Sequence, residues 1–529
     1  MDELRFDNRF TRLLPADPEA ENQRRQVYQA CYSRVKPAQV SKPALIAYAP
    51  DVAKLLNLSQ SFCESETFVN TFSGNQLHPD MDAHATCYGG HQFGSWAGQL
   101  GDGRAINLGE LVNAADQRWM LQLKGAGPTP YSRNADGLAV LRSSVREFLC
   151  SEAMFHLGVP TTRALSLVLT GEQVMRDMFY DGRAALEPGA IVCRVAPSFT
   201  RFGSLQIFSA RKDMQTLQAL LDHTITYDFP HLGVPDRDCY LRWFEEVCQS
   251  TAELMVHWMR VGFVHGVMNT DNMSVLGLTI DYGPYGWLEG FDPDWTPNTT
   301  DREMRRYSFG KQSGIAGWNL ARLGEAILPL IGDVEALQEA LHRYSASYRA
   351  MWQEMMANKL GLESFEKQTD VTLLEELQNI LTLSETDMTI FYRKLANLDA
   401  TVDPDTLDDT QIIQPLLEAY YVPDDMKGDM KRQIASWLRL YVRRLQQDGR
   451  SNEERKVLMN QTNPKYVLRN YLSQVAIDQA EAGGYSEIHK LYELLKHPYD
   501  EQPEFESYAA RRPDWARNRA GCSMLSCSS

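Results

Sequence analysis

The stretch GFVHGVMNTDNMSVLGLTIDYGP, residues 262–284, places an asparagine and an aspartate on either side of a short apolar segment. The pieces MSVLGL and TI between them predict two short strands that turn at Gly277. Such a hairpin would bring Asn272 and Asp281 close together. Amide and carboxylate oxygens are hard ligands that suit Mg²⁺, which commonly takes one or two of them together with phosphate oxygens. The stretch therefore predicts a divalent metal site.

The same stretch resembles the catalytic loop of protein kinases, which reads H-R-D-L-x-x-x-N and is followed by D-F-G. Aligning His265 with the motif histidine places Asn272 on the metal-binding asparagine and Asp281 on the D-F-G aspartate. The catalytic aspartate then falls on Val267, which cannot accept a proton. Asp271 is the remaining carboxylate that could act as general base, a role typically worth about a hundredfold to ten-thousandfold in rate. We expect His265 to be a structural residue that holds the loop.

A glycine-rich turn, GQLGDGR at residues 98–104, precedes two predicted strands. The first strand runs from Arg104 to Val112, and the second, WMLQLK, ends at Lys124. Glycines allow backbone N–H groups to approach phosphates closely. Such a turn alone is more often an ordinary loop, but a turn followed by a lysine strand predicts a phosphate-binding element.

Apolar residues recur at helical spacing from Leu138 onward, with Asp136 placed to cap the start of the helix. Glu147 lies on this helix, so the chain has the order of lysine strand and glutamate helix that kinases use for an ion pair. The alternative for Glu147 is a capping box with Ser144. The ion pair with Lys124 is favoured because the apolar periodicity begins before Ser144, which puts Glu147 inside the helix.

Two arginines, Arg194 and Arg201, accompany a further strand pattern. Guanidinium groups bind polyphosphates through paired hydrogen bonds. Surface arginines paired with the abundant acidic side chains are an equally good explanation. The residues alone leave both interpretations open.

The bulk composition limits the classes of partner. The chain has 529 residues, with 53 basic and 69 acidic side chains and a formal net charge of −16. A chain this acidic is not expected to bind nucleic acid or an anionic membrane. The N-terminus MDELRFDNRF lacks the apolar core of a secretory signal, and no apolar run has the length of a bilayer span. We expect a soluble, cytoplasmic protein.

The nine cysteines show no C-x-x-C spacing of a zinc site. Most of them are expected to be reduced and buried. Cys522 and Cys527 lie in a Ser-rich tail that we expect to be mobile, where a thiol is accessible to redox chemistry. The sequence leaves open whether these two thiols form a regulatory disulfide.

Strand patterns dominate the front of the chain and helix patterns the rear, which predicts an α+β fold with the nucleotide cleft between two lobes. Residues 43–59, PALIAYAPDVAKLLNLS, are the clearest helical piece near the N-terminus, and a long amphipathic helix over residues 238–260 ends at Gly262. The predicted organisation is an N-terminal extension (1–75), a sheet-rich lobe with the glycine turn, lysine strand and glutamate helix (76–212), a helical lobe with the catalytic and metal-binding loops (213–400), and a helical C-terminal extension with a flexible cysteine-containing tail (401–529).

Five blocks in order carry a family resemblance: YGGHQFGSWAGQLGDGRAINLGE, LQLKGAGPTPYSRNADGLAVLRSSVREFLCSEAM, GFVHGVMNTDNMS, IDYGP and NPKYVLRNYL. They resemble the signature blocks of the selenoprotein O family, also called the protein adenylyltransferase or YdiU family. The resemblance implies a protein-kinase-like bilobal fold. It implies transfer of AMP from ATP to Ser, Thr or Tyr hydroxyls of proteins, including self-modification, with UMP transfer from UTP among bacterial members and Mg²⁺ or Mn²⁺ as cofactor.

The family resemblance also assigns roles to residues of this chain. In that family the nucleotide binds in a flipped orientation, with the α-phosphate facing the acceptor and the γ-phosphate buried. The implied roles are Asp271 as catalytic base, Asn272 and Asp281 as metal ligands with Asp281 also at the nucleotide, Lys124 on a phosphate and paired with Glu147, Gly101, Gly103, Arg104, Asp136 and Gly137 as nucleotide-binding positions, and Arg194 and Arg201 at the γ-phosphate.

One departure and two rival functions remain. Eukaryotic members of the family place selenocysteine third from the C-terminus, where this chain has Cys527. A small-molecule or protein phosphotransferase of kinase-like fold is one rival, but such enzymes retain the aspartate that Val267 replaces. A non-catalytic nucleotide-binding pseudokinase is the other, although this chain keeps the expected metal and phosphate ligands. We expect a monomer.

Overall fold

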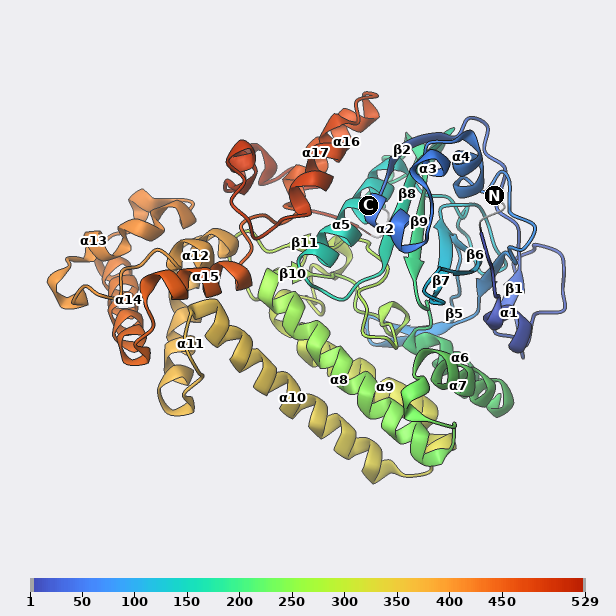
Figure 1. Ribbon diagram of the computed structural model, residues 1–529, viewed down its shortest axis with the longest axis horizontal. Helices are drawn as coiled ribbons and strands as arrows, with labels where there is room; N and C mark the ends of the chain where they lie inside the picture. Colours follow the sequence, from blue (N-terminus) through green and yellow to red (C-terminus); the bar gives the residue numbers. More distant parts are fainter. Residues whose placement is uncertain (1–3, 527–529) are drawn as a thin grey trace.

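The computed structural model describes residues 4–526, and Figure 1 shows a sheet-bearing part joined to a largely helical part. The strands of the main sheet lie within residues 32–196, whereas the chain from residue 202 onward is mainly helical. The predicted α+β class is confirmed. The two kinase-like lobes and the domain boundaries stay predictions.

The main sheet has seven strands in the order β1-β3-β6-β7-β9-β8-β2, and every neighbouring pair is antiparallel. Every residue of β6 is buried, as expected for a strand covered on both faces. The strands predicted before Lys124 and around Arg194 are confirmed at the centre of this sheet. The strands are β1 (Tyr32–Arg34), β2 (Ala44–Tyr48), β3 (His84–Thr86), β6 (Ala105–Val112), β7 (Arg118–Lys124), β8 (Arg163–Arg176) and β9 (Ala185–Ala196), with β4 (Gly89–Gln92) and β5 (Ser95–Gln99) forming a separate hairpin.

The segment predicted as helical over residues 43–59 is helical only in part. Ala44–Tyr48 forms β2, which pairs with β8 at the edge of the sheet, and α2 (Pro50–Leu55) follows directly. The free backbone groups at the edge of β8 give this short apolar run hydrogen-bond partners that outweigh its local preference. The prediction of a helix is therefore wrong for residues 44–48.

Three long helices, α8, α9 and α10, pack together in the helical part (Figure 1). Helix α8 (Arg237–Val261) ends at Gly262, whose φ of 74° is the left-handed conformation common at helix ends, so the predicted helix over residues 238–260 is confirmed. No helix within residues 4–526 is long and apolar enough to cross a bilayer. The other helices are α1 (Arg9–Leu13), α3 (Gln60–Cys63), α4 (Glu66–Phe72), α5 (Leu141–His156), α6 (Phe202–Ala210), α7 (Met214–Asp228), α9 (Gln312–Ile331), α10 (Val334–Leu360), α11 (Lys367–Leu383), α12 (Met388–Leu395), α13 (Asp409–Ile413), α14 (Gly428–Asp448), α15 (Asn452–Thr462), α16 (Asn470–Glu481) and α17 (Ser486–Leu495).

The segment after α8 does not form the predicted hairpin. Ser274 forms a β-bridge with Arg201, whereas Thr279 forms one with Thr161. The two halves of the segment therefore pair with different parts of the chain instead of with each other. The short strand that begins the segment, β10 (Phe263–Val264), pairs with β11 (Gly286–Trp287). The predicted pair of strands around Gly277 is wrong.

Helix α5, which carries Glu147, is buried around nearly its whole circumference. It packs against β8 and β9, and α16 and α17 from the C-terminal region also contact it. The helix begins at Leu141 because the residues before it are held extended by β-bridges at Leu138 and Val140. Asp136 therefore does not cap α5, and the predicted cap is wrong.

A buried ion pair joins the NPKYVLRNYL segment to α12. The guanidinium of Arg469 donates to both carboxylate oxygens of Asp387, at 2.7 and 3.0 Å, and the two side chains are 1% and 0% exposed. Asp387 also accepts a hydrogen bond from the backbone N–H of Ile390 at the start of α12. This fully desolvated ion pair therefore ties the segment just before α16 to the start of α12.

Replacing Asp387 with alanine is expected to lower the free energy of unfolding by about 3–5 kcal/mol, because it leaves the Arg469 guanidinium buried without its partner. Urea unfolding followed by circular dichroism measures the change. Asp405→Ala is the matched control, since the Arg443–Asp405 pair is 48% and 60% exposed and should contribute about 1 kcal/mol or less. Equal losses in the two variants would contradict this account.

The end of the described chain is folded back onto the protein. The backbone N–H of Leu525 donates to the carbonyl of Pro297 at 3.0 Å, and that of Thr299 donates to Leu525 at 2.8 Å. Cys522 is 1% exposed, and burial raises the pKa of its thiol to about 11. The prediction of an accessible thiol in a mobile tail is therefore wrong for Cys522. Cys527 lies outside the described residues.

Candidate functional site

The register of the central strands brings three polar side chains together. Gln122 on β7 lies directly opposite Arg194 on β9, and Lys124 lies two residues further along β7 and so on the same face. The ammonium of Lys124 is 2.5 Å from a carboxylate oxygen of Glu147, with both side chains buried. The ion pair predicted between the lysine strand and the glutamate helix is confirmed.

Asp281 lies at the centre of a cluster of positive charge. One of its carboxylate oxygens is 2.5 Å from the guanidinium of Arg194, and the other pairs with Arg201. Arg194 also contacts Glu147 at 3.1 Å, so Lys124, Arg194 and Arg201 form one continuous network with the two carboxylates. The alternative of exposed surface arginines is excluded, since Arg194 and Arg201 are 2% and 1% exposed.

Burial and pairing pull the pKa values of this network apart. Burial lowers the pKa of Lys124 to about 8, although the neighbouring Glu147 acts in the opposite direction. Burial alone would raise the pKa of Asp281, but Arg201, Arg194 and Lys124 hold it well below its usual range. Asp281 is therefore ionised at neutral pH. A further negative charge next to Lys124 would raise the pKa of Lys124 and favour its charged form.

Asp271 has a different environment in the same region. Its side chain is buried, its Oδ2 accepts a weak hydrogen bond from Gln92 at 3.3 Å, and its Oδ1 has no partner among the described residues. Burial raises the pKa of Asp271 to about 7. A carboxyl group with a free oxygen and a pKa near neutrality has the properties of a general base.

The hairpin β4–β5 packs directly on the loop that carries Asp271. The backbone N–H of His91 donates to the hydroxyl of Thr270 at 2.7 Å. A Cβ added at Gly90 would lie 2.4 Å from Oδ1 of Asp271, so only glycine permits this close approach. The first glycines of the YGGHQFG segment therefore position the hairpin against the loop, a role that the sequence did not reveal.

The network and Asp271 border one cleft of about 340 Å³. Its wall holds the basic side chains of Arg104, Lys124, Arg133 and Arg194 against three acidic ones. Of the predicted site residues, the lining includes Gly103, Arg104, Lys124, Arg194, Asp271, Asn272 and Asp281.

Five other predicted site residues do not line the cleft. Glu147 and Arg201 lie behind it, where they contact Lys124 and Asp281 respectively. Gly101 adopts a positive φ of 73° against the ring of Tyr131. Asp136 forms a half-exposed ion pair with Arg176 at 2.7 Å, and Gly137 packs against the backbone of residue 127.

The loop predicted as catalytic supplies hard oxygen donors next to the cleft. Asn272 donates its amide N–H to the carbonyl of Val267 at 2.8 Å. Its Oδ1 has no hydrogen-bond partner among residues 4–526. His265 stacks on Trp258 and shares a hydrogen bond of 2.9 Å with the carbonyl of Ile280, so its predicted structural role is confirmed.

The donor set fits a magnesium-type ion. In the part of the chain that the structure describes, no group of three or more His, Cys, Asp or Glu side chains is arranged to hold a metal. Mg²⁺ requires fewer protein ligands, since it takes one or two oxygens and completes its shell with water and phosphate. The amide oxygen of Asn272 and the carboxylate of Asp281 are ligands of this type on residues that line one cleft, and the Asp281 oxygens are also paired with Arg194 and Arg201.

Sequence reasoning missed several residues of the cleft. Gln92 contacts Asp271, and Asn269 accepts a hydrogen bond from the hydroxyl of Tyr307 at 2.6 Å. The ring of Tyr88 lies under the guanidinium of Arg201, 4.5 Å from its carbon. The positions of these residues depend on contacts between distant segments of the chain. The only signal in the sequence is the high density of glycines near Gln92, which indicates that another segment packs closely against the backbone at this point.

A cleft that gathers buried cations, hard oxygen donors and a carboxyl group of raised pKa defines a nucleotide-using transferase. Comparison with known proteins agrees. The family described as "Protein adenylyltransferase SelO" matches residues 17–496. A relative from Rhodopirellula baltica named "Protein nucleotidyltransferase YdiU" is 57% identical over 537 residues, covering 100% of this chain and 99% of the relative. One of the same name from Aromatoleum aromaticum is 56% identical over 533 residues, covering 100% of both chains.

The chain therefore belongs to the protein adenylyltransferase SelO family. It is a nucleotidyltransferase, which uses a nucleoside triphosphate as co-substrate.

Proposed function

We propose that this enzyme transfers AMP from ATP, and UMP from UTP, to Ser, Thr or Tyr hydroxyls of protein substrates and of its own chain. The observation that carries the proposal is the buried carboxyl group of Asp271, which has one unpartnered oxygen and belongs to a residue that lines the same cleft as Asn272 and Asp281. Val267 occupies the position where a kinase would keep its base. The base has therefore moved along the loop, which suits a nucleophile that attacks a different phosphate.

In the proposed reaction Asp271 accepts the proton of the acceptor hydroxyl. The hydroxyl oxygen forms a bond to the α-phosphorus, the bond from that phosphorus to the bridging oxygen breaks, and pyrophosphate leaves with the bonding electrons. The burial that raises the pKa of Asp271 favours this step, because a base works best when its pKa is close to the working pH.

The buried network is proposed to hold the triphosphate. Arg194, which lines the cleft, would bind the γ-phosphate with Arg201 behind it, and Lys124 would bind an inner phosphate. Gly103 and Arg104 would lie against the nucleotide, with Gly101, Asp136 and Gly137 outside the lining of the cleft. Guanidinium and ammonium groups in a desolvated site stabilise phosphate charge far more than they would in water. The buried arginines behind the cleft support this flipped orientation, because a γ-phosphate that enters the cleft first would lie closest to their positive charge.

Asn272 and Asp281 would hold Mg²⁺ or Mn²⁺, which supplies charge neutralisation at the phosphates when bound. The kinase-like arrangement of two lobes, with boundaries at residues 75, 212 and 400, belongs to the same proposal, as do a monomeric state and a cytoplasmic location. Support for the two lobes comes from the lysine strand, glutamate helix and catalytic loop, which follow one another in the kinase order and meet at one cleft.

Incubation with Mg²⁺ and ATP labelled at either the α- or the γ-phosphate separates the candidate functions. The enzyme is expected to incorporate the α-label into its own chain and to release labelled pyrophosphate from γ-labelled ATP. Incorporation of γ-label alone would establish a phosphotransferase instead. A chain that binds ATP but incorporates neither label, even with a protein extract as acceptor, would be a pseudokinase.

A further inference from the structure

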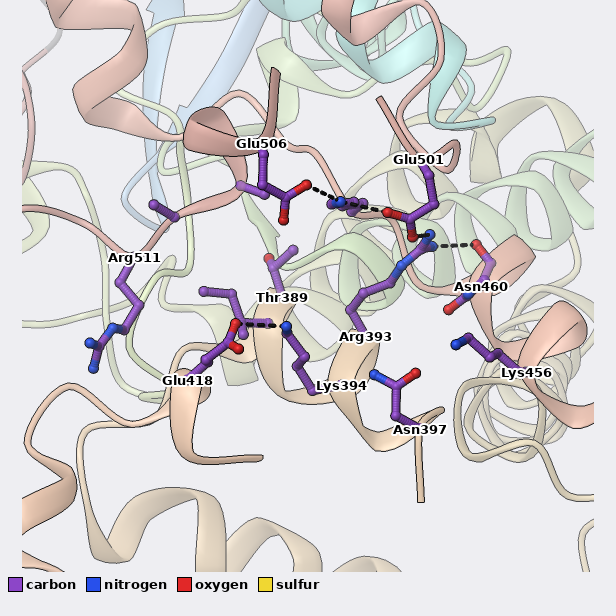
Figure 2. Close-up of a pocket in the computed structure, with 14 residues that line it drawn as sticks. Thr389, Arg393, Lys394, Asn397, Glu418, Lys456, Asn460, Glu501, Glu506 and Arg511 are labelled. Carbon is purple, nitrogen blue, oxygen red and sulfur yellow. Dashed lines mark hydrogen bonds and ion pairs between the residues drawn. The ribbon is translucent and has the colours of Figure 1, made fainter. Parts of the chain in front are cut away.

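The C-terminal region contains a second cleft, of about 680 Å³, twice the volume of the nucleotide cleft. It is formed by α12, α15 and residues 501–511, and Figure 2 shows its side chains. Volumes of this order are typical of ligand sites. Five basic and three acidic side chains line it, so it is locally positive in a chain whose net charge is −16.

The three acidic side chains are already paired within the cleft. Glu501 and Glu506 both contact the ammonium of Lys465, each at 2.5 Å, and Glu501 also contacts the guanidinium of Arg393 at 2.8 Å. Glu418 contacts Lys394 at 2.6 Å. In Figure 2 the Glu418–Lys394 pair is drawn apart from Glu501 and Glu506. The three carboxylates are therefore neutralised by basic side chains of the same cleft.

Two cations are left over, and they lie on opposite sides. Lys456 makes no ion pair or hydrogen bond among residues 4–526. Arg511 donates one nitrogen to the carbonyl of Tyr420, and its other terminal nitrogen has no such partner. Figure 2 shows Arg511 and Lys456 on opposite sides of the labelled side chains, with the Glu418–Lys394 pair between them. Negative groups separated along an extended ligand would match this arrangement.

The cleft also presents amide groups suited to a peptide backbone. Oδ1 of Asn460 is buried without a hydrogen-bond partner, and the side chain of Asn397 likewise has none in the described part of the chain. A carboxamide offers both a donor and an acceptor, which is the pair that a main-chain peptide group requires. A small inorganic anion would use the donors and leave the buried acceptor of Asn460 unsatisfied.

We propose that this cleft binds an acidic, extended peptide segment and, given the proposed function, that it docks protein acceptors for nucleotide transfer. Lys456 and Arg511 would bind the acidic side chains, and Asn397 and Asn460 the backbone between them. The docking surface selects acceptors by charge pattern at a place separate from the residues that perform the transfer.

The test is fluorescence anisotropy of a fluorescein-labelled oligoglutamate peptide with the full-length enzyme, in the absence of nucleotide. The Lys456→Glu/Arg511→Glu double variant is expected to weaken binding at least about tenfold, which corresponds to about 1.4 kcal/mol. Lys54→Glu/Lys367→Glu makes the same charge change at exposed positions outside the cleft and should change binding less than about twofold. If circular dichroism shows that the Lys456→Glu/Arg511→Glu variant does not fold, the Lys456→Ala/Arg511→Ala variant replaces it. The alanine variant is expected to weaken binding in the same direction but by less.

Three outcomes would overturn the proposal: equal losses in the cleft and control variants, no preference for oligoglutamate over oligoglutamine, or displacement of the peptide by inorganic phosphate at an equal concentration. The last result would assign the cleft to small anions. Self-incorporation of α-label separates this proposal from the proposed function. A wild-type enzyme that incorporates the label but does not bind the peptide would rule out only the docking site. A wild-type enzyme that binds the peptide but does not incorporate the label would rule out only the reaction.

Discussion

Replacing Asp281 with alanine is expected to lower the rate of nucleotidyl transfer at least about a thousandfold, equivalent to about 4 kcal/mol of transition-state stabilisation. The carboxylate is the charged member of the proposed metal-ligand pair, and both of its oxygens also balance Arg194 and Arg201. Its loss removes the metal ligand and leaves two buried guanidinium groups without their central partner. No neighbouring carboxylate of the cleft occupies the same position between these arginines.

Single-turnover incorporation of α-label at saturating ATP and Mg²⁺ measures this effect. Circular dichroism and thermal unfolding establish that the variant is folded. Asp82→Ala is the matched control, since Asp82 pairs with the half-exposed Arg34 at 3.1 Å and lies outside the cleft, so its rate should stay within about twofold of wild type. Full activity of the Asp281 variant would refute the assignment of the metal site.

Replacing Asp271 with asparagine is expected to reduce kcat by about a hundredfold to ten-thousandfold, the typical contribution of a general base. Asparagine keeps the shape of the side chain but cannot accept the proton of the acceptor hydroxyl. The Michaelis constant for ATP should change little, because the proposed phosphate ligands remain in place. A kcat within about fivefold of the wild-type value would rule out Asp271 as the base.

The pH dependence of the wild-type enzyme tests the same assignment. Because burial raises the pKa of Asp271 to about 7, the base form gains population as the pH rises through 7, and activity should rise with it. A divalent cation bound at Asn272 favours the carboxylate, so increasing Mg²⁺ should move this midpoint downward. The Asp271→Asn variant should lose this part of the pH profile. An unchanged profile in the variant would assign the titration to another group.

Stability provides an internal control for the Asp271 variant. A carboxyl whose pKa is higher in the folded than in the unfolded state binds more protons when folded, so its contribution to stability falls as the pH rises from about 4 to about 7. Above pH 7 the wild type retains the full cost of burying this charge. The variant should therefore be no less stable than the wild type at pH 8, and low activity there would reflect lost chemistry.

The local elements of the fold could largely be predicted from the sequence. Strands β6, β7 and β9 and helix α8 have strong periodicity or clear end signals such as Gly262, so these predictions were confirmed. The failures occurred where a short segment had a tertiary partner. Residues 44–48 pair with the edge of β8, and Ser274 and Thr279 bridge to different segments. In such cases a few long-range hydrogen bonds outweigh weak local preferences.

The amino-acid sequence alone shows which groups are available for the proposed chemistry: the lysine strand, the glutamate helix, the proposed metal-ligand pair and the loop in which Asp271 is the proposed base. How these groups interact depends on contacts between segments that are distant in the chain. The tertiary structure buries Arg194 and Arg201 around Asp281, packs Gly90 against Asp271, and folds the segment with Cys522 back onto the protein. The physical reason is that a carboxyl group's pKa and a thiol's accessibility depend on burial and on charges brought from distant segments.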